Sequence, residues 1–326
     1  MTRTQSTGPG VVALGGGHGL AATLRALRRV SDDITAIVGV SDDGGSSGRL
    51  RRDFDIVPPG DLRMALAALC GDDSWGRTWS RVVQHRFSGE GELGGHALGN
   101  LLIAALWEET GDIVTGLDWV ASLLDAHGRV LPLSTSPLEI VAAVAGLHPT
   151  DPHHLTEVRG QVAVAQTRGR VESVRLEPDG TSVCPEALEA VHAADALIIG
   201  PGSWYSSVLT HFLLSDMRAA FVESRAEKIC NLNLAPQAGE TAHFHLHTHL
   251  DVLHEHVPEL RLDVVLAERA VVSDRAALER SARRLGATVE LASLAEHADQ
   301  PRHSPDLLAA AIRPLLPRRG HRGMAG

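Results

Sequence analysis

The chain has 326 residues, 44% of them hydrophobic and 21% charged, and 30 basic against 40 acidic side chains leave a formal net charge of −10. This composition is typical of a soluble globular protein and excludes the disordered and fibrous classes. The acidic balance argues against nucleic acid as a partner, because non-specific nucleic-acid binding requires a basic surface.

The sequence contains no segment that predicts a membrane protein. No apolar run approaches the ~20 residues that a membrane-spanning helix needs, and the polar N-terminal segment leads into no secretory signal core. We therefore expect a cytoplasmic protein without membrane insertion. Cys70, Cys184 and Cys230 are scattered, which predicts neither a disulfide framework nor a metal clip. Lys228 is the only lysine, so a phosphate-binding loop of the Gly-Lys-Ser/Thr type is excluded.

The first forty residues predict a β-α-β unit. Residues 10–14 and 34–40 are continuous runs of Val, Ile and Ala, which are typical of parallel strands buried on both faces. A glycine-rich loop and a helix over residues 20–30 separate them. Further helices are expected at 61–69, 96–110 and 113–126.

The texture changes at residues 131–178, where prolines and two alternating runs, 158–164 and 171–176, predict a β-rich insertion. Strands separated by helices then resume at 196–199, 229–232, 262–266 and 288–291. Strands that alternate with helices at both ends of the chain predict an α/β fold with one doubly wound, mostly parallel sheet. We therefore expect residues 1–326 to form a single domain that carries the insertion, with a frayed tail after residue 315.

The loop after the first strand is the first candidate site. With so few side chains, its backbone N–H groups can approach an anion at the start of the next helix. A tight strand-to-helix turn is the structural alternative. The third glycine of a dinucleotide fingerprint would fall at Leu20, so we do not expect NAD as a cofactor. The predicted phosphate-binding residues are Gly15, Gly16, Gly17, His18 and Gly19.

The second strand runs into a loop with two adjacent carboxylates, Asp42 and Asp43, and no helix is expected directly after them. Carboxylates beside a phosphate suit a hydrated Mg²⁺, which makes Asp42 and Asp43 the candidate metal ligands. An ordinary Asp- and Gly-rich loop, or Asp42 on a ribose, are the alternatives. Asp61 is expected to be a helix N-cap. The remaining candidates to surround the anion are Gly44, Gly45, Ser46, Ser47 and Arg49.

His96 and Asn100 are four residues apart and predict one polar helix face, which indicates either a ligand or a buried network. Later, the strand at 196–199 enters a second glycine turn and a helix that Ser203 would cap, which predicts a second anion site. The amides after the next strand can read a base or a sugar. The candidate residues of these two loops are Gly200, Gly202, Ser203, Tyr205, Ser206, Asn231, Asn233 and Gln237.

Four histidines, His243, His245, His247 and His249, alternate along the chain. On a strand this spacing would place several imidazoles on one face as metal ligands. No carboxylate or cysteine motif accompanies them, so we interpret them as exposed polar residues. Neither zinc nor haem is expected as a cofactor.

The glycine, aspartate, Pro-Pro-Gly-Asp, Gly-Gly-His and second glycine motifs, at residues 13–20, 42–49, 58–63, 94–101 and 200–206, occur in an order that resembles the YvcK-like gluconeogenesis factors of the CofD-like superfamily. The resemblance covers residues 11–310. It implies a Rossmann-like three-layer fold that binds a nucleoside diphosphate or a nucleotide sugar such as UDP-N-acetylglucosamine. It also implies a role in cell shape during growth on gluconeogenic carbon.

Two functions follow from this resemblance. In the first, the protein is a regulator that binds a nucleotide sugar without turnover. In the alternative, it is a 2-phospho-L-lactate transferase that uses Mg²⁺ held by aspartates to move a phospholactyl group onto a deazaflavin hydroxyl. A homo-oligomer is compatible with either function.

Overall fold

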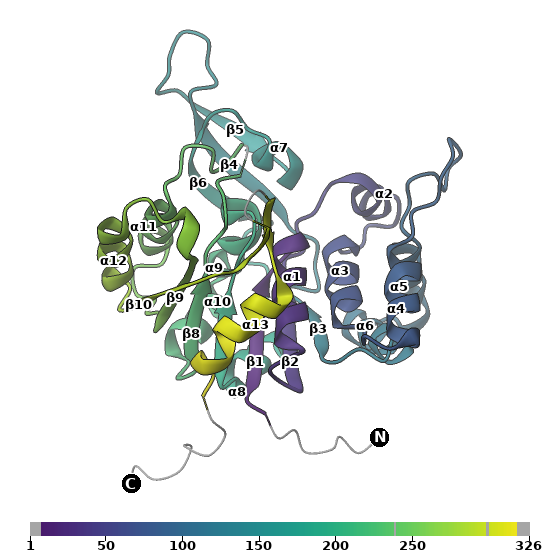
Figure 1. Ribbon diagram of the computed structural model, residues 1–326. Coiled ribbons are helices and arrows are strands. Elements are labelled where there is room, and N and C mark those ends of the chain that lie inside the picture. The colour runs from purple at the N-terminus through teal and green to yellow at the C-terminus, as the bar shows by residue number, and fades with distance from the viewer. Residues whose placement is uncertain (1–7, 238, 298–299, 318–326) are drawn as a thin grey trace.

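The computed structural model describes residues 8–237, 239–297 and 300–317 and is built around one parallel sheet (Figure 1). Its strands lie in the order β10-β9-β8-β7-β1-β2-β3, and each neighbouring pair is parallel. The strands are β1 (Gly10–Gly15), β2 (Asp33–Val38), β3 (Arg129–Pro132), β7 (Ala196–Ile199), β8 (Glu227–Asn231), β9 (Val264–Glu268) and β10 (Thr288–Ala292).

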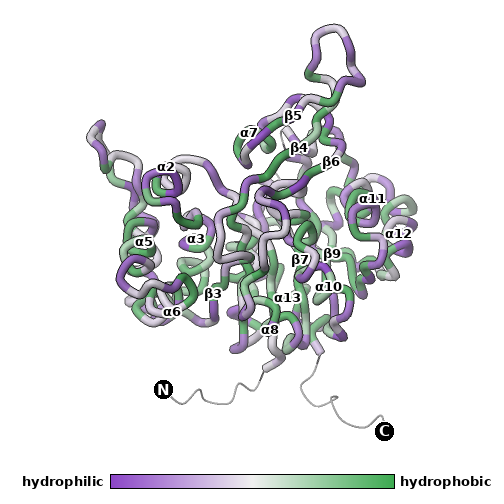
Figure 2. The backbone as a smooth tube through the Cα atoms, turned by 180° about the vertical axis from the view of Figure 1, so that it is seen from behind, coloured by the Kyte–Doolittle hydropathy of each residue, from purple (hydrophilic) through white to green (hydrophobic). Residues whose placement is uncertain are grey.

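Helices cover both faces of the sheet, which makes the fold a three-layer α/β sandwich (Figures 1 and 2). On one face α1 (Gly17–Leu27) packs against α3 (Gly60–Leu69) and α13 (Pro305–Ile312). On the other face α8 (Pro185–Ala193) packs against α10 (Ser215–Glu223). A second pair, α11 (Leu246–His256) and α12 (Arg275–Arg284), lies beside β9 and β10. The short helices are α9 (Thr210–Leu213), η1 (Trp204–Val208), η2 (Arg269–Val271) and η3 (Arg313–Leu315).

Beyond the β3 edge, four helices form a lobe with α3 (Figure 1). They are α2 (Gly45–Phe54), α4 (Ser74–Gln84), α5 (Leu98–Thr110) and α6 (Ile113–Leu123). Three expected helices are therefore confirmed as α3, α5 and α6, although α5 begins at Leu98 rather than at residue 96. The helix α2 was not expected, because the Gly- and Ser-rich segment that starts it resembles a loop.

The central strands carry the apolar runs that the sequence predicted. Ala36, Ile37, Ile198 and Ile199 are fully buried, as parallel strands covered on both faces must be. Figure 2 shows the contrast between these hydrophobic strands and the hydrophilic outer helix α12. The doubly wound parallel sheet is confirmed.

The insertion is a three-stranded antiparallel sheet in the order β5-β4-β6, and it lies above the ends toward which the parallel strands run (Figure 1). Its elements are β4 (Glu139–Ala145), β5 (Leu155–Arg159), α7 (Gln161–Ala165) and β6 (Arg170–Glu177). The expected strand at 158–164 is wrong, because Gly160 adopts a φ of 88° that ends β5 and starts α7. The expected boundary at residue 131 also shifts, because Val130 and Leu131 pair with β2 in the main sheet.

Two further findings concern the C-terminal tail and the membrane prediction. Of the tail that we expected to fray, residues 318–326 lie outside the described part of the chain. Among the described residues, no helix combines the length and the apolar character needed to cross a membrane.

Candidate functional site

Four loops meet at the carboxyl edge of the sheet around β1. The first glycine loop (residues 15–19) follows β1 and the aspartate loop (residues 41–49) follows β2, whereas the second glycine loop (residues 200–206) follows β7 and the third loop (residues 231–241) follows β8. Because β1 lies between β2 and β7, the strand order reverses here, which is where doubly wound folds bind ligands. The two glycine loops touch, since Thr23 Oγ1 donates to the carbonyls of Gly19 and Gly200 at 3.3 Å each.

The first glycine loop has little room for side chains. A Cβ atom at Gly16 would collide with Asp61 Oδ2, and one at Gly19 would collide with the carbonyl oxygen of Pro201. Gly17 has a φ of 58°, which favours glycine. The first glycine loop thus packs closely against both α3 and the second glycine loop. This packing accounts for part of its glycine content, in line with the structural alternative to a phosphate site. The same packing leaves the start of α1 at the centre of the converging loops, with His18 exposed beside it.

Two carboxylates from different elements lie beside this loop. Asp42 Oδ1 accepts the Gly44 N–H at 2.9 Å, and a Cβ atom at Gly60 would lie 3.0 Å from Asp42 Oδ2. Burial and, to a smaller extent, the charge of Asp42 raise the pKa of Asp61 to about 7. Burial also raises the pKa of Asp42. Two acids that repel one another in this way suit a proton or a cation between them.

Asp61 was expected only as an N-cap, but Pro59 occupies the N-cap position of α3 and Asp61 lies in its first turn. The signal that could have identified it is the preceding Pro-Pro-Gly, because Gly60 lets Ser47 and Asp42 approach the helix. Asp61 therefore belongs to the site, whereas the predicted capping role is wrong.

The adjacent carboxylates of the aspartate loop diverge. Asp43 Oδ1 accepts the N–H of Val162 at 3.0 Å, so this side chain lies against the start of α7. Ser41 Oγ donates to Gln161 Oε1 at 3.1 Å in the same direction. Of the two predicted magnesium ligands, Asp42 is the one whose charge acts on the buried carboxyl group of Asp61.

His96 and Asn100 belong to a buried network, although the prediction that they share one helix face is wrong, because His96 lies before the start of α5. Ser46 Oγ accepts hydrogen bonds from Asn100 Nδ2 at 3.0 Å and from the Ala97 N–H at 3.3 Å, and it lies 3.0 Å from His96 Nδ1. With both lone pairs engaged, its hydroxyl proton is directed to His96. Burial lowers the pKa of His96, which favours the neutral ring that accepts this proton. This network ties the start of α2 to α5, as one of the two alternatives predicted.

Two arginines of this region make contacts that the sequence did not predict. Arg49 donates to the carbonyls of Gly94 at 2.8 Å and Glu92 at 3.4 Å, so its guanidinium is engaged with that loop. Arg63 is buried and donates to Asn100 Oδ1 at 2.8 Å. Burial lowers the pKa of Arg63 to about 10, and the charges of Asp61 and Asp42 oppose this change. Arg63 was not among the predicted site residues. The signal that could have identified it is its position, with Asp61, at the start of a helix whose other side chains are apolar.

The third loop organises the second glycine loop. Asn233 accepts the Gly202 N–H at 2.9 Å and donates to the Gly202 carbonyl at 2.8 Å, while Gln237 Nε2 donates to Ser203 Oγ at 3.2 Å. The prediction of a helix capped by Ser203 is wrong, because the π-helical turn η1 follows and the serine side chain does not cap it. The hydroxyl of Tyr205 donates to the Val171 carbonyl at 3.3 Å and so links this loop to the insertion.

Glu240 is a site residue that the sequence patterns did not identify. It accepts the N–H of Ser206 at 3.2 Å, and burial raises its pKa to about 7. Several buried polar atoms of the second and third loops, and one of His249 on α11, lack a hydrogen-bond partner among the described residues, and such atoms require water or a ligand. They are Trp204 Nε1, Ser206 Oγ, both amide atoms of Asn231, Gln237 Oε1, Glu240 Oε1 and His249 Nε2.

The alternating histidines do not lie on a strand, because α11 begins at Leu246. The rings of His245 and His247 are stacked with centroids 5.6 Å apart, whereas His249 is buried and packs edge-on against Trp204. Within the described ranges, no group of three or more His, Cys, Asp or Glu side chains is arranged to hold a metal ion.

Comparisons with known proteins agree on one family. The family model described as 2-phospho-L-lactate transferase CofD matches residues 11–301. A relative from Mycobacterium tuberculosis (strain H37Rv) is 47% identical over 306 residues, which are 93% of this chain and 89% of the relative. A Listeria innocua protein named gluconeogenesis factor is 33% identical over 98% of this chain and 99% of its own.

A solved structure gives the same result. The crystal structure of a UPF0052-family protein from Bacillus halodurans superposes with a TM-score of 0.83 at 33% identity, over 94% of this chain and 98% of that one. Both the sequence and the fold therefore match along nearly the whole length. The chain belongs to the CofD family, among relatives that include gluconeogenesis factors.

Proposed function

We propose that the protein is a regulatory protein that binds a nucleotide sugar of the UDP type and does not turn it over rapidly. The observation that carries this proposal is the convergence of the two glycine loops that follow the neighbouring strands β1 and β7, at the switch point of the sheet. Backbone N–H groups presented by loops without side chains suit a diphosphate. The proposed cellular role is the support of cell shape during growth on gluconeogenic carbon, and the name of the Listeria relative, gluconeogenesis factor, supports the link to gluconeogenesis.

The acids beside the first glycine loop make the proposed binding depend on a cation. Asp42 and Asp61 would repel a diphosphate, and the buried Arg63 supplies a single positive charge that both acids already attract. Mg²⁺ prefers one or two carboxylates together with phosphate oxygens, so this pair fits it. When bound, Mg²⁺ would neutralise the charge of the two acids and of the diphosphate. Asp61 thereby replaces Asp43 as the proposed second ligand.

The polar atoms without partners on the second and third loops suit the nucleoside and sugar end of the ligand. Asn231 is fully buried with both amide atoms unpaired among the described residues, and hydroxyl groups of a sugar both donate and accept. The amides of Asn233 and Gln237 are engaged with the second glycine loop and would hold its shape rather than read the base.

A transferase remains the alternative because the matching family model carries that description. Transfer to a hydroxyl requires a base near the acceptor. His96 was the candidate, and its Nδ1 atom is occupied by Ser46. This engagement favours binding without turnover.

A screen of melting temperatures tests the binding proposal. We expect UDP-N-acetylglucosamine and UDP to raise the melting temperature in a concentration-dependent way, more strongly with Mg²⁺, because a ligand that binds only the folded state stabilises it by mass action. GDP should act more weakly and NAD should have no effect. Stabilisation by NAD alone would contradict the proposal.

A turnover assay separates the two functions. The protein is incubated with Mg²⁺, a guanosine diphosphate conjugate of lactate and the deazaflavin alcohol, and GMP is measured. We expect no GMP above the background of a heat-denatured sample. Release of GMP at enzymatic rates would favour the transferase.

A further inference from the structure

The five-residue helix α7 of the insertion lies between two of the loops that form the site. At its start, Asp43 Oδ1 accepts the Val162 N–H at 3.0 Å, and a Cβ atom at Gly160 would collide with Asp43 Oδ2. Gly44 adds to this contact, because its Cβ atom would lie 2.9 Å from Val162 Cγ2. Glycines at positions 44 and 160 thus let the aspartate loop and α7 approach closely.

The other end of α7 meets the third loop. A Cβ atom at Gly239 would collide with the carbonyl oxygen of Ala165, the last residue of α7. Gly239 also has a φ of 98°, so both its space and its backbone conformation require glycine. The length of α7 therefore sets the separation between the aspartate loop and the third loop.

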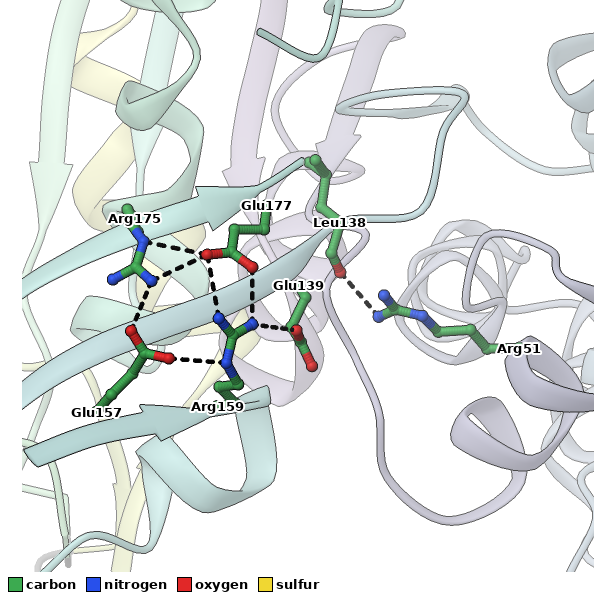
Figure 3. Close-up of polar contacts among 7 residues, drawn as sticks. All are labelled: Arg51, Leu138, Glu139, Glu157, Arg159, Arg175 and Glu177. Carbon is green, nitrogen blue, oxygen red and sulfur yellow. Dashed lines mark hydrogen bonds and ion pairs between the residues drawn. The ribbon is translucent and has the colours of Figure 1, made fainter. Parts of the chain in front are cut away.

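The exposed face of the insertion carries a polar network of its own. On its outer face Arg159 pairs with Glu177 at 2.7 Å and Glu139 at 3.0 Å, and Arg175 pairs with Glu157 at 2.7 Å (Figure 3). Figure 3 also shows that Arg51 of α2 reaches the Leu138 carbonyl, at 2.8 Å. The polar network on the insertion thus holds its strands to one another. Buried residues of the insertion, such as Ile140, Val164 and Val174, belong to the same hydrophobic core as the main sheet. Polar contacts such as those of Asp43 and Arg51 add to this attachment.

We propose that Asp43 is a positioning residue that fastens α7, and with it the insertion, over the ligand site, and that it is not a metal ligand. Its carboxylate acts as an N-cap supplied from outside the helix, because it accepts an N–H of the first turn of α7. The binding of a ligand between the aspartate loop and the third loop is then coupled to the position of the insertion. Only this coupling to a ligand rests on the proposed nucleotide-sugar function.

Hydrogen–deuterium exchange of the protein without ligand tests the fastening. In Asp43→Ala, amides of residues 160–166 should exchange about five- to tenfold faster than in wild type, the loss expected when an N-cap is removed. Asp43→Asn should exchange like wild type, because an asparagine oxygen caps equally well. The matched control is Asp32→Asn, which removes an exposed charge before β2. Equal exchange in Asp43→Ala and wild type would overturn the proposal.

A calorimetric comparison tests the second half of the proposal. With UDP-N-acetylglucosamine, Asp43→Asn should keep the Mg²⁺ dependence of the affinity within about twofold of wild type, whereas Asp42→Asn should lose it. Loss of this dependence in Asp43→Asn to the same extent as in Asp42→Asn would identify Asp43 as a metal ligand and overturn the proposal. If the wild type binds no nucleotide, the proposed function fails, and the exchange experiment without ligand still decides the role of Asp43.

Discussion

The carboxyl groups of Asp61 and Asp42 show how tertiary contacts give a residue a property that its sequence position does not. From the sequence, Asp61 is predicted to be a helix N-cap because it follows a helix-breaking segment. In the structure, burial beside Asp42 raises its pKa to about 7. Arg63 and Glu240 likewise acquire their roles from contacts with other elements, Arg63 with Asn100 of α5 and Glu240 with the second glycine loop. Sequence patterns identified the loops that carry these contacts, but not the side chains that meet from other elements.

The raised pKa of Asp61 predicts how stability depends on pH. The folded protein keeps a proton on Asp61 between its ordinary pKa of 3.8 and about 7, whereas the unfolded chain releases it. The folded state then binds more protons, so the free energy of unfolding falls as the pH rises through this window and levels off above it. In Asp61→Asn this fall should be smaller. Glu240, whose pKa is also raised to about 7, acts in the same direction. The buried histidines His211, His249 and His303, whose pKa values burial lowers to about 4, act in the opposite direction.

Urea denaturation at several pH values between about 5 and 8 measures this effect in wild type, Asp61→Asn and Glu240→Gln. In each variant the free energy of unfolding should fall less with rising pH than it does in wild type. Identical slopes in wild type and Asp61→Asn would show that this carboxyl group titrates in the folded state as it does in the unfolded chain.

Close packing between the two glycine loops gives a second prediction. Gly19→Ala would place a methyl group on the Pro201 carbonyl, so we expect the free energy of unfolding to fall by ~1–3 kcal/mol. Gly91→Ala is the matched control, because no atom lies within 4 Å of its Cβ position, and its effect should stay within ~0.5 kcal/mol. Equal effects of the two substitutions, measured by urea denaturation, would contradict the contact.

At the scale of elements, the sequence predicted those that have a strong hydrophobic period and failed at those set by a few contacts. The strands β1, β2, β7, β8, β9 and β10 are all close to their expected positions. By contrast, α2 begins with glycine and serine, and α7 is a single short turn fixed by Gly160 and the side chain of Asp43. Neither helix has enough regularly spaced apolar residues to be predicted from the sequence alone.

The caps of the lobe helices give a prediction at this scale. Asp112 Oδ1 accepts the N–H of Thr115 at 2.7 Å at the start of α6, and the hydrogen bonds from Thr115 lower the pKa of Asp112. Asp112→Ala should therefore lower the free energy of unfolding by about 1 kcal/mol, and Asp112→Asn should be nearly neutral.

The contribution of Asp112 also depends on pH. Because its folded pKa is lowered, the part of the stabilisation that depends on the charge is complete above the ordinary pKa and disappears as the pH falls through the folded pKa. The difference between wild type and Asp112→Ala should thus shrink in acid, as measured by thermal or urea denaturation. A difference that stays constant down to about pH 2 would contradict a charged cap.

At the scale of the whole molecule, the sheet places four loops from distant parts of the sequence around β1. The sequence predicted a doubly wound sheet and the order of its motifs, because buried parallel strands have a simple apolar signature. It could not predict that the insertion lies over the carboxyl edge, or that α7 separates the aspartate loop from the third loop. Those features follow from packing between segments more than 100 residues apart, such as the contact of Asp43 with Val162.

The most direct test of ligand binding at this edge is a calorimetric titration of UDP-N-acetylglucosamine into wild type and Asp42→Asn, each with and without Mg²⁺. We predict saturable one-site binding to wild type that weakens about tenfold when Mg²⁺ is removed, which corresponds to ~1.4 kcal/mol. In Asp42→Asn the affinity should no longer respond to Mg²⁺, while the melting temperature of the unliganded protein stays close to that of wild type. The absence of binding to wild type, or an equal response to Mg²⁺ in both proteins, would contradict a cation-assisted diphosphate site at Asp42.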